Sequence, residues 1–152
     1  MTRSTLITLA TLAGLFASLP AAAQFQRPEV AVKYRKAAFT VMGTHFGRIG
    51  AMANGRIPFD GTVAAANADL VVVMARLPYA GFVDGTSGTG KGSAKANIWT
   101  ERAKFDEAAK KMQDEVVKLA AAAKTNNLDN LKTAFGSAAA SCKACHDVYQ
   151  ND

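Results

Sequence analysis

The residues best suited to chemistry in this chain of 152 residues lie near its C-terminal end. Cys142 and Cys145 are the only two cysteines, and His146 directly follows the second of them. A disulfide between Cys142 and Cys145 would close too short a loop to stabilise a fold appreciably. The two thiols and the imidazole therefore require a chemical explanation.

Three chemistries use two cysteines at this spacing. A redox pair of the thioredoxin type lies at the N-terminus of a helix that follows a strand, but this chain shows no strand pattern. A structural zinc site needs four ligands, and only His45, far away in sequence, could join His146. The third chemistry is covalent attachment of haem, for which two cysteines separated by two residues and followed by histidine are a known signature.

The helical spacing of these residues favours attachment of haem. Cys142 and Cys145 are three positions apart and share one face of a helix, from which two thioether bonds can reach one iron protoporphyrin IX. His146 lies four positions after Cys142 and can place its imidazole under the iron as the axial ligand. The sequence therefore predicts one haem c per chain, attached through both cysteines, with His146 as the iron ligand.

Four segments with heptad-like apolar spacing make up most of the chain, and none alternates as a strand does. A helix is expected from residue 28 to about 54, a second from about 60 until Pro78, a third from about 100 and a fourth from about 128. This pattern predicts an all-α fold, an antiparallel up-down four-helix bundle around the haem. The expected inward stripes are Val32, Arg35, Phe39, Met42, Phe46 and Ile49; Val63, Ala66, Leu70, Val73 and Leu77; Phe105, Ala109, Met112, Val116, Leu119 and Ala123; and Leu128, Leu131, Phe135, Ala138, Cys142, Cys145 and Tyr149.

Residues 81–97 are rich in Gly, Ser and Thr and are expected to form the one long loop of the bundle. A phosphate-binding loop is disfavoured, because no strand precedes this segment and no Gly-Lys-Ser/Thr sequence ends it. We expect a surface loop in which variation is tolerated.

Residues 1–23 have the composition of a cleaved secretory signal. Arg3 supplies a positive start, residues 6–19 are mostly apolar, and residues 21–23 are alanines that suit a cleavage site. Removal of this leader leaves one domain, residues 24–152, and lowers the formal net charge from +6 to +5, because the leader holds one Arg and no acid. No later stretch is expected to span a membrane, and the mild basicity does not indicate a nucleic-acid partner.

Six short segments between residues 24 and 152 form a pattern typical of one known family: Gln24-Phe25, Val32-Lys33-Tyr34-Arg35, His45-Phe46-Gly47-Arg48, Leu77-Pro78-Tyr79, Ala134-Phe135-Gly136 and Ser141-Cys142-Lys143-Ala144-Cys145-His146-Asp147. On these residues the chain closely resembles the cytochrome c′ family, the class II c-type cytochromes, over residues 24–152. The resemblance implies a five-coordinate, high-spin haem that binds NO and CO on a crowded distal face. It also implies a periplasmic homodimer formed through the first two helices. We expect gas binding, or electron transfer to an unidentified periplasmic redox partner, and not an enzyme.

The resemblance assigns roles to four further residues. Arg35 is expected to bind a haem propionate, since an unpaired buried guanidinium is costly; a salt bridge to a carboxylate at the rim of the bundle is the alternative. Phe39 matches the apolar distal residue that covers the open face of the iron. Tyr79 and Phe82 resemble the aromatic lining of the pocket. From the residues alone, a role in the pocket could not be preferred over core packing for any of these three aromatic side chains.

The sequence also leaves open a second coordination state of the haem iron, and it departs from the family pattern at Gln150. Met42 lies one turn beyond Phe39 and could complete a six-coordinate, low-spin haem, as in related electron carriers of class II. His45 falls off that stripe, which favours a surface or interface role. Gln150 stands where the family commonly has Arg or Lys, four residues after the ligating histidine, and the loss of that charge should change the electrostatic field near His146.

Overall fold

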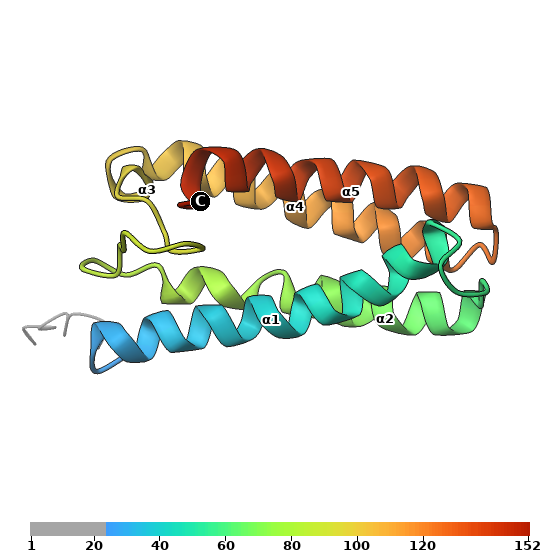
Figure 1. The fold of residues 1–152 in the computed structure, drawn as a ribbon, viewed down its shortest axis with the longest axis horizontal. Coiled ribbons are helices and arrows are strands. Elements are labelled where there is room, and N and C mark those ends of the chain that lie inside the picture. The colour runs from blue at the N-terminus through green and yellow to red at the C-terminus, as the bar shows by residue number, and fades with distance from the viewer. Residues whose placement is uncertain (1–23) are drawn as a thin grey trace, which may run out of the picture.

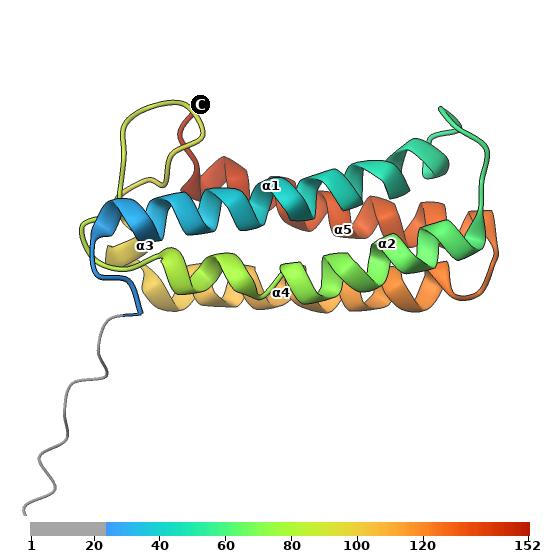
Figure 2. The same ribbon diagram turned by 90° about the horizontal axis from the view of Figure 1, so that it is seen from below.

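Four long helices form an antiparallel bundle (Figures 1 and 2). The computed structural model describes residues 24–152, so the expected secretory signal lies outside the described residues. Within those residues the only β pairing is an isolated bridge between Ala94 and Gln150. The prediction of an all-α four-helix bundle is confirmed. The elements in chain order are α1 (Pro28–Ala53), α2 (Gly61–Met74), the 3-10 helix η1 (Leu77–Gly81), the short α3 (Asn97–Thr100), α4 (Arg102–Ala123) and α5 (Leu128–Tyr149).

The long helices close into a ring. α1 packs against α2, α2 against α4, and α4 against α5, while α1 and α5 also touch. That last contact is tight at Gly50, where a Cβ atom would lie only 2.6 Å from Cζ of Phe135. Figure 1 shows α1 and α5 converging at this end of the bundle and separating toward the N-terminal end of α1. The bundle is therefore closed at one end and open at the other.

Local signals set most of the helix ends. Pro28 begins α1, Asp60 caps α2 by accepting from the Val63 amide at 3.0 Å, and Asn127 caps α5 by accepting two amide hydrogen bonds. Pro78 does not end α2 as expected, because the α-helix stops four residues earlier, at Met74. Pro78 instead lies at the start of η1, where a proline without an amide proton is tolerated.

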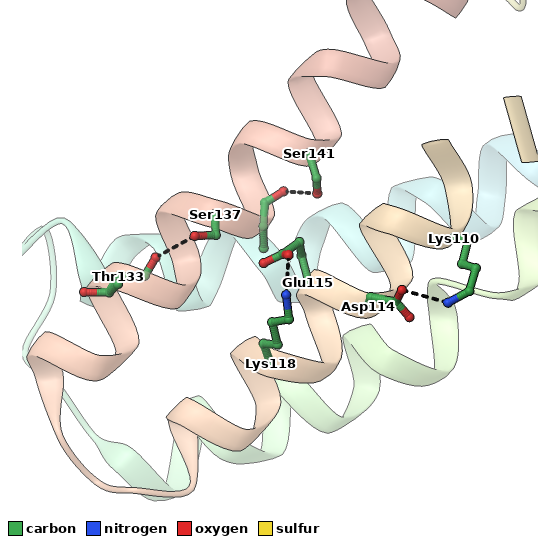
Figure 3. A network of polar contacts seen from close by, with 8 residues as sticks. Lys110, Asp114, Glu115, Lys118, Thr133, Ser137 and Ser141 are labelled. Atoms are coloured by element: carbon green, nitrogen blue, oxygen red, sulfur yellow. Dashed lines mark hydrogen bonds and ion pairs between the residues drawn. The ribbon is translucent and has the colours of Figure 1, made fainter. Parts of the chain in front are cut away.

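The expected stripes of α1, α4 and α5 point inward. On α4 every member of the stripe is buried, and its opposite face carries the expected charges. There Lys110 pairs with Asp114 at 2.8 Å and Lys118 with Glu115 at 2.7 Å, as Figure 3 shows beside the hydroxyls of α5. Such exposed pairs contribute little stability, so the apolar stripe orients α4.

The stripe predicted for α2 is wrong. Its members Val63, Leu70 and Val73 are exposed, and the helix buries Ala64, Asn67, Ala68 and Val71 instead. α2 is apolar on both faces, so two stripes compete for the core. The structure buries the stripe of smaller side chains, which allow close approach to α1 and α4, and leaves the bulkier stripe outside.

The segment Gly61–Gly81 meets the length and composition of a membrane span, with 21 residues and a mean hydropathy of 1.3. The expectation that no stretch after the leader would do so is therefore wrong on those measures. They are weak evidence for a span, because core helices of globular proteins pass the same test. Here the α-helix ends at Met74, and the apolarity of the segment arises from one buried and one exposed face.

A matched pair of valines on α2 tests which face is buried. Val71→Ala should lower the free energy of unfolding by about 2 kcal/mol, from two lost methyl groups and a residual cavity, because Val71 is 1% exposed. Val73→Ala should change it by less than about 0.5 kcal/mol, because Val73 is 58% exposed. Urea unfolding of dilute protein measures both, and equal losses would contradict the assignment of the faces.

Candidate functional site

A cavity of about 790 Å³ occupies the open end of the bundle. Its volume lies within the range of cofactor and ligand pockets. Helices α1, α4 and α5, together with η1 and the loop after it, supply its walls. The lining is rich in apolar side chains, among them Phe39, Met42, Phe46, Tyr79, Phe82, Phe105 and Met112. A large, mainly apolar group would match this volume and lining.

The α5 wall carries Cys142, Cys145 and His146, all of which line the cavity. The helical spacing predicted from the sequence is present, because α5 runs without interruption from Leu128 to Tyr149. The two thiols are free and half-buried. Cys142 and Cys145 therefore face the same space as the imidazole of His146.

The surroundings of the two thiols disfavour a redox or a zinc role. Burial raises the pKa of Cys142 and of Cys145, whereas a reactive dithiol needs a lowered pKa at a helix N-terminus. The pair instead lies near the C-terminal end of α5. Within residues 24–152 no three His, Cys, Asp or Glu side chains are grouped so that they could hold a metal ion. His45 is not part of the cavity, and its Nδ1 lies 2.8 Å from Oδ1 of Asn67 on α2.

The α1 wall carries Phe39 and Met42, both of which line the cavity. Phe39 contacts two aromatic rings edge-on, with centroid distances of 6.2 Å to Tyr79 and 6.3 Å to Phe82. Tyr79 and Phe82 line the cavity as well. The structure thus brings the three aromatic residues predicted for the pocket together, with Met42 one turn further along α1.

Arg35 is buried, with an exposure of 4%, at the edge of the cavity. Its guanidinium donates to Gly81 O at 3.0 Å, to Thr86 Oγ1 at 2.7 Å and to Thr86 O, and its Cζ lies 4.5 Å from the centre of the Phe82 ring. Gly81 permits this approach, because a Cβ atom there would lie 2.6 Å from Ala31 O. Arg35 thus fastens η1 and the following loop to α1.

The charge of Arg35 is left without an anion by these contacts. All three acceptors are neutral, and the ion pairs among residues 24–152 do not include Arg35. Burial lowers the pKa of this guanidinium. Of its five N–H donors, the Nε proton and one Nη2 proton remain unused. The carboxylate partner considered from the sequence is absent from the described residues, and a bound anion would fit the two remaining donors.

Residues 86–95, here called the strap, form a further wall of the cavity. Arg35 holds their first residue, Thr86. Asn151 connects two points further along, because its Nδ2 donates to Gly88 O at 2.7 Å and to Ser93 Oγ at 3.0 Å. Backbone hydrogen bonds from Gly92 to Asn151, from Asn151 to Ser93 and from Lys95 to Tyr149 complete the attachment. The strap was expected to be a tolerant surface loop, but residues 91–94 line the cavity.

The C-terminal turn of α5 brings polar groups to the same wall. Gln150 lines the cavity, and its backbone N–H donates to His146 O at 3.0 Å. Lys143 and Asp147 also line the cavity, where they form an exposed ion pair at 2.7 Å. Gln150 is neutral and adds no charge beside His146.

Sequence reasoning missed two residues that position the strap, Thr86 and Asn151. The role of each depends on a partner more than 50 residues away in the chain.

Comparison with known proteins identifies this arrangement. The sequence model of a family described as Cytochrome C' matches residues 30–150. The chain belongs to the cytochrome c′ family. Cytochrome c' of Alcaligenes xylosoxydans xylosoxydans is 45% identical over 127 residues, which cover 84% of this chain and 98% of that protein. Membership of the cytochrome c′ family implies a haem c cofactor, and the cavity, its thiols and Arg35 fit that group.

Solved structures of the cytochrome c′ family agree with this assignment. The crystal structure of cytochrome c' from Rubrivivax gelatinosus has a TM-score of 0.78 and 44% identity, and the match covers 84% of this chain and all of that chain. A nitric oxide complex of a point mutant of cytochrome c prime from Alcaligenes xylosoxidans also has a TM-score of 0.78, with 43% identity over 85% of this chain and 99% of that chain. The resemblance identified from the sequence is confirmed.

Replacing Asn151 tests the attachment of the strap. Asn151→Ala removes two hydrogen bonds, so we expect a loss of about 1 kcal/mol in unfolding free energy and a roughly fivefold faster exchange of the Gly92 and Lys95 amides. Asn130→Ala is a matched control, because its side chain donates to Thr125 at the connection between α4 and α5, away from the strap. Hydrogen exchange that accelerates equally in both variants would contradict a local role for Asn151.

Proposed function

We propose that the chain carries one haem c, attached through Cys142 and Cys145, with His146 as the iron ligand. The observation that carries this proposal is the shared cavity wall on α5, where both thiols and the imidazole face one apolar space of about 790 Å³. Helical spacing fixes the three side chains relative to one another. When bound, haem c would supply an iron atom able to bind diatomic gases and to exchange single electrons.

We propose that the iron is five-coordinate and high-spin and that gases reach it from the Phe39 side. Phe39 is held by Tyr79 and Phe82, so it restricts the size of a ligand without offering a polar atom. The nitric oxide complex among the solved relatives supports gas binding. The function that follows is capture or buffering of NO, with CO as a further ligand and one-electron transfer as an accompanying activity.

Arg35 would anchor the cofactor through a propionate. Two of its donors are unused, its charge has no anion among residues 24–152, and it lies at the edge of the cavity. An anionic partner would offset the cost of burying the guanidinium. The α1 residues that line the cavity include no carboxylate or imidazole to act as an acid or base, which supports a binding protein rather than an enzyme.

The alternative function is that of a six-coordinate, low-spin electron carrier with Met42 as the second axial ligand. The observation that favours it is the position of Met42, which lines the same wall of the cavity as Phe39. Methionine thioethers serve as axial ligands in c-type cytochromes. In the first function Phe39 would cover the iron on the side away from His146, whereas in the second the thioether of Met42 would bind it there.

Spectra of the reduced protein distinguish the two functions. We expect a high-spin spectrum that shifts on addition of CO and is unchanged in Met42→Leu, a variant of similar volume. Met112→Leu serves as a control, because Met112 lines the cavity from α4. A low-spin spectrum that becomes high-spin only in Met42→Leu would establish the alternative. Colour extracted by acidified acetone would refute covalent attachment.

We further propose that the leader, residues 1–23, directs the protein to the periplasm. Its redox partner there is unidentified.

We also propose that the mature chain forms a homodimer through α1 and α2. The exposed stripe of α2 supports the dimer. Its spacing of alternately three and four residues is typical of a seam between packed helices, and its side chains remain exposed within one chain. A second copy would cover them. The members of this seam are Val63, Ala66, Leu70, Val73 and Leu77.

A charge in the seam tests the dimer. Val73→Asp should convert a dimer to a monomer in sedimentation experiments, because a buried unpaired carboxylate at the interface is costly. Val117→Asp is the matched control, since Val117 is a similarly exposed valine on α4, outside the seam. Equal sedimentation of Val73→Asp and the unmodified protein would place the interface elsewhere.

A further inference from the structure

Tyr79 occupies a fixed position in the wall of the cavity. It lies in η1, and three aromatic rings surround it, with centroid distances of 6.2 Å to Phe39, 6.0 Å to Phe82 and 5.8 Å to Phe105. A ring packed on several sides has little rotational freedom. The direction of its hydroxyl is therefore set by the packing.

The hydroxyl of Tyr79 has no partner in the protein. None of the hydrogen bonds made by side chains in residues 24–152 involves it, although its neighbours Val83, Phe82 and Gly81 all accept from other donors. In the same part of the chain, the only side-chain oxygen or nitrogen that is both fully buried and unpartnered is Asn97 Oδ1. The Tyr79 oxygen is therefore accessible, and Tyr79 lines the cavity.

The ring of Tyr79 packs against aromatic residues from two walls of the cavity, Phe39 on α1 and Phe105 on α4. Tyr79 lines the same cavity as the thiols of α5. Burial raises the pKa of Tyr79 most, and Cys145 and Cys142 raise it further, so the hydroxyl keeps its proton at neutral pH and can donate it in a hydrogen bond. The ring packing alone does not require an oxygen here, because phenylalanines fill the neighbouring positions.

We propose that the Tyr79 hydroxyl is a hydrogen-bond donor for a polar or anionic diatomic ligand bound on the Phe39 side, and so a specificity-determining residue. This inference rests on the proposed function, because the ligand binds to the iron of the haem. Phe39 limits the size of the ligand, whereas Tyr79 discriminates by polarity. A donor without a partner in the protein breaks no internal hydrogen bond when it binds a ligand.

The test compares an anionic ligand, cyanide on the oxidised protein, with a weakly polar one, CO on the reduced protein. Tyr79→Phe should speed dissociation of cyanide by about fivefold to tenfold, the effect of one lost hydrogen bond, and dissociation of CO by less than about twofold. Tyr34→Phe is the matched control, since this phenol packs on Phe25, outside the cavity, and should change neither rate.

A second measurement separates ligand recognition from a structural role. The free energy of unfolding of Tyr79→Phe should match that of the unmodified protein, because no hydrogen bond within the protein is lost. A tenfold lower folding equilibrium constant, or equal acceleration of cyanide and CO dissociation, would overturn the inference. Unchanged cyanide dissociation in a haem-containing variant would overturn it too, without affecting the proposed function, whereas a protein with no attached haem would refute both.

Discussion

The structure depends on keeping a large apolar cavity open inside a small bundle. Apolar surface in contact with water is unfavourable, and a cavity of about 790 Å³ lined largely by apolar side chains would expose much of it if nothing filled the space. The cavity is therefore suited to a large apolar group. Membership of the cytochrome c′ family implies such a group, haem c. The alanine-rich core confines it to one end, since Ala53, Ala64, Ala68 and Ala123 let the helices pack closely at the other.

The sequence predicted helices with opposed faces better than helices that are apolar all round. On α4 a charged face stands opposite the apolar stripe, so only one face could be buried. All six residues of the predicted stripe are buried, and Ala120 is the one buried residue of α4 outside it. On α2 both faces are apolar, so spacing alone could not choose between the stripe of Val73 and that of Val71. The choice depends on the volume available beside α1 and α4. That property belongs to the assembled bundle, and a single helix does not contain it.

The same distinction applies to the site. The shared position of Cys142, Cys145 and His146 was predictable because it is local: one continuous helix determines which face they share. Phe39, Tyr79 and Phe82 were assigned through the resemblance to a family, and the structure shows that their rings meet. The strap was not predictable. Its composition indicates only a loop, and its position depends on contacts of Thr86 and Asn151 with distant parts of the chain.

Arg35 joins the architecture of the cavity to its chemistry. Its three hydrogen bonds attach η1 and the strap to α1, so the guanidinium helps to build the walls, yet the neutral acceptors leave its charge uncompensated. A lysine could not replace it, because an ammonium has three donors and these contacts already use three. Only the guanidinium can hold both wall segments and still present two donors to an anion. An anion bound there would stabilise the charge that the walls require, so anchoring of the cofactor and closure of the cavity would depend on one side chain.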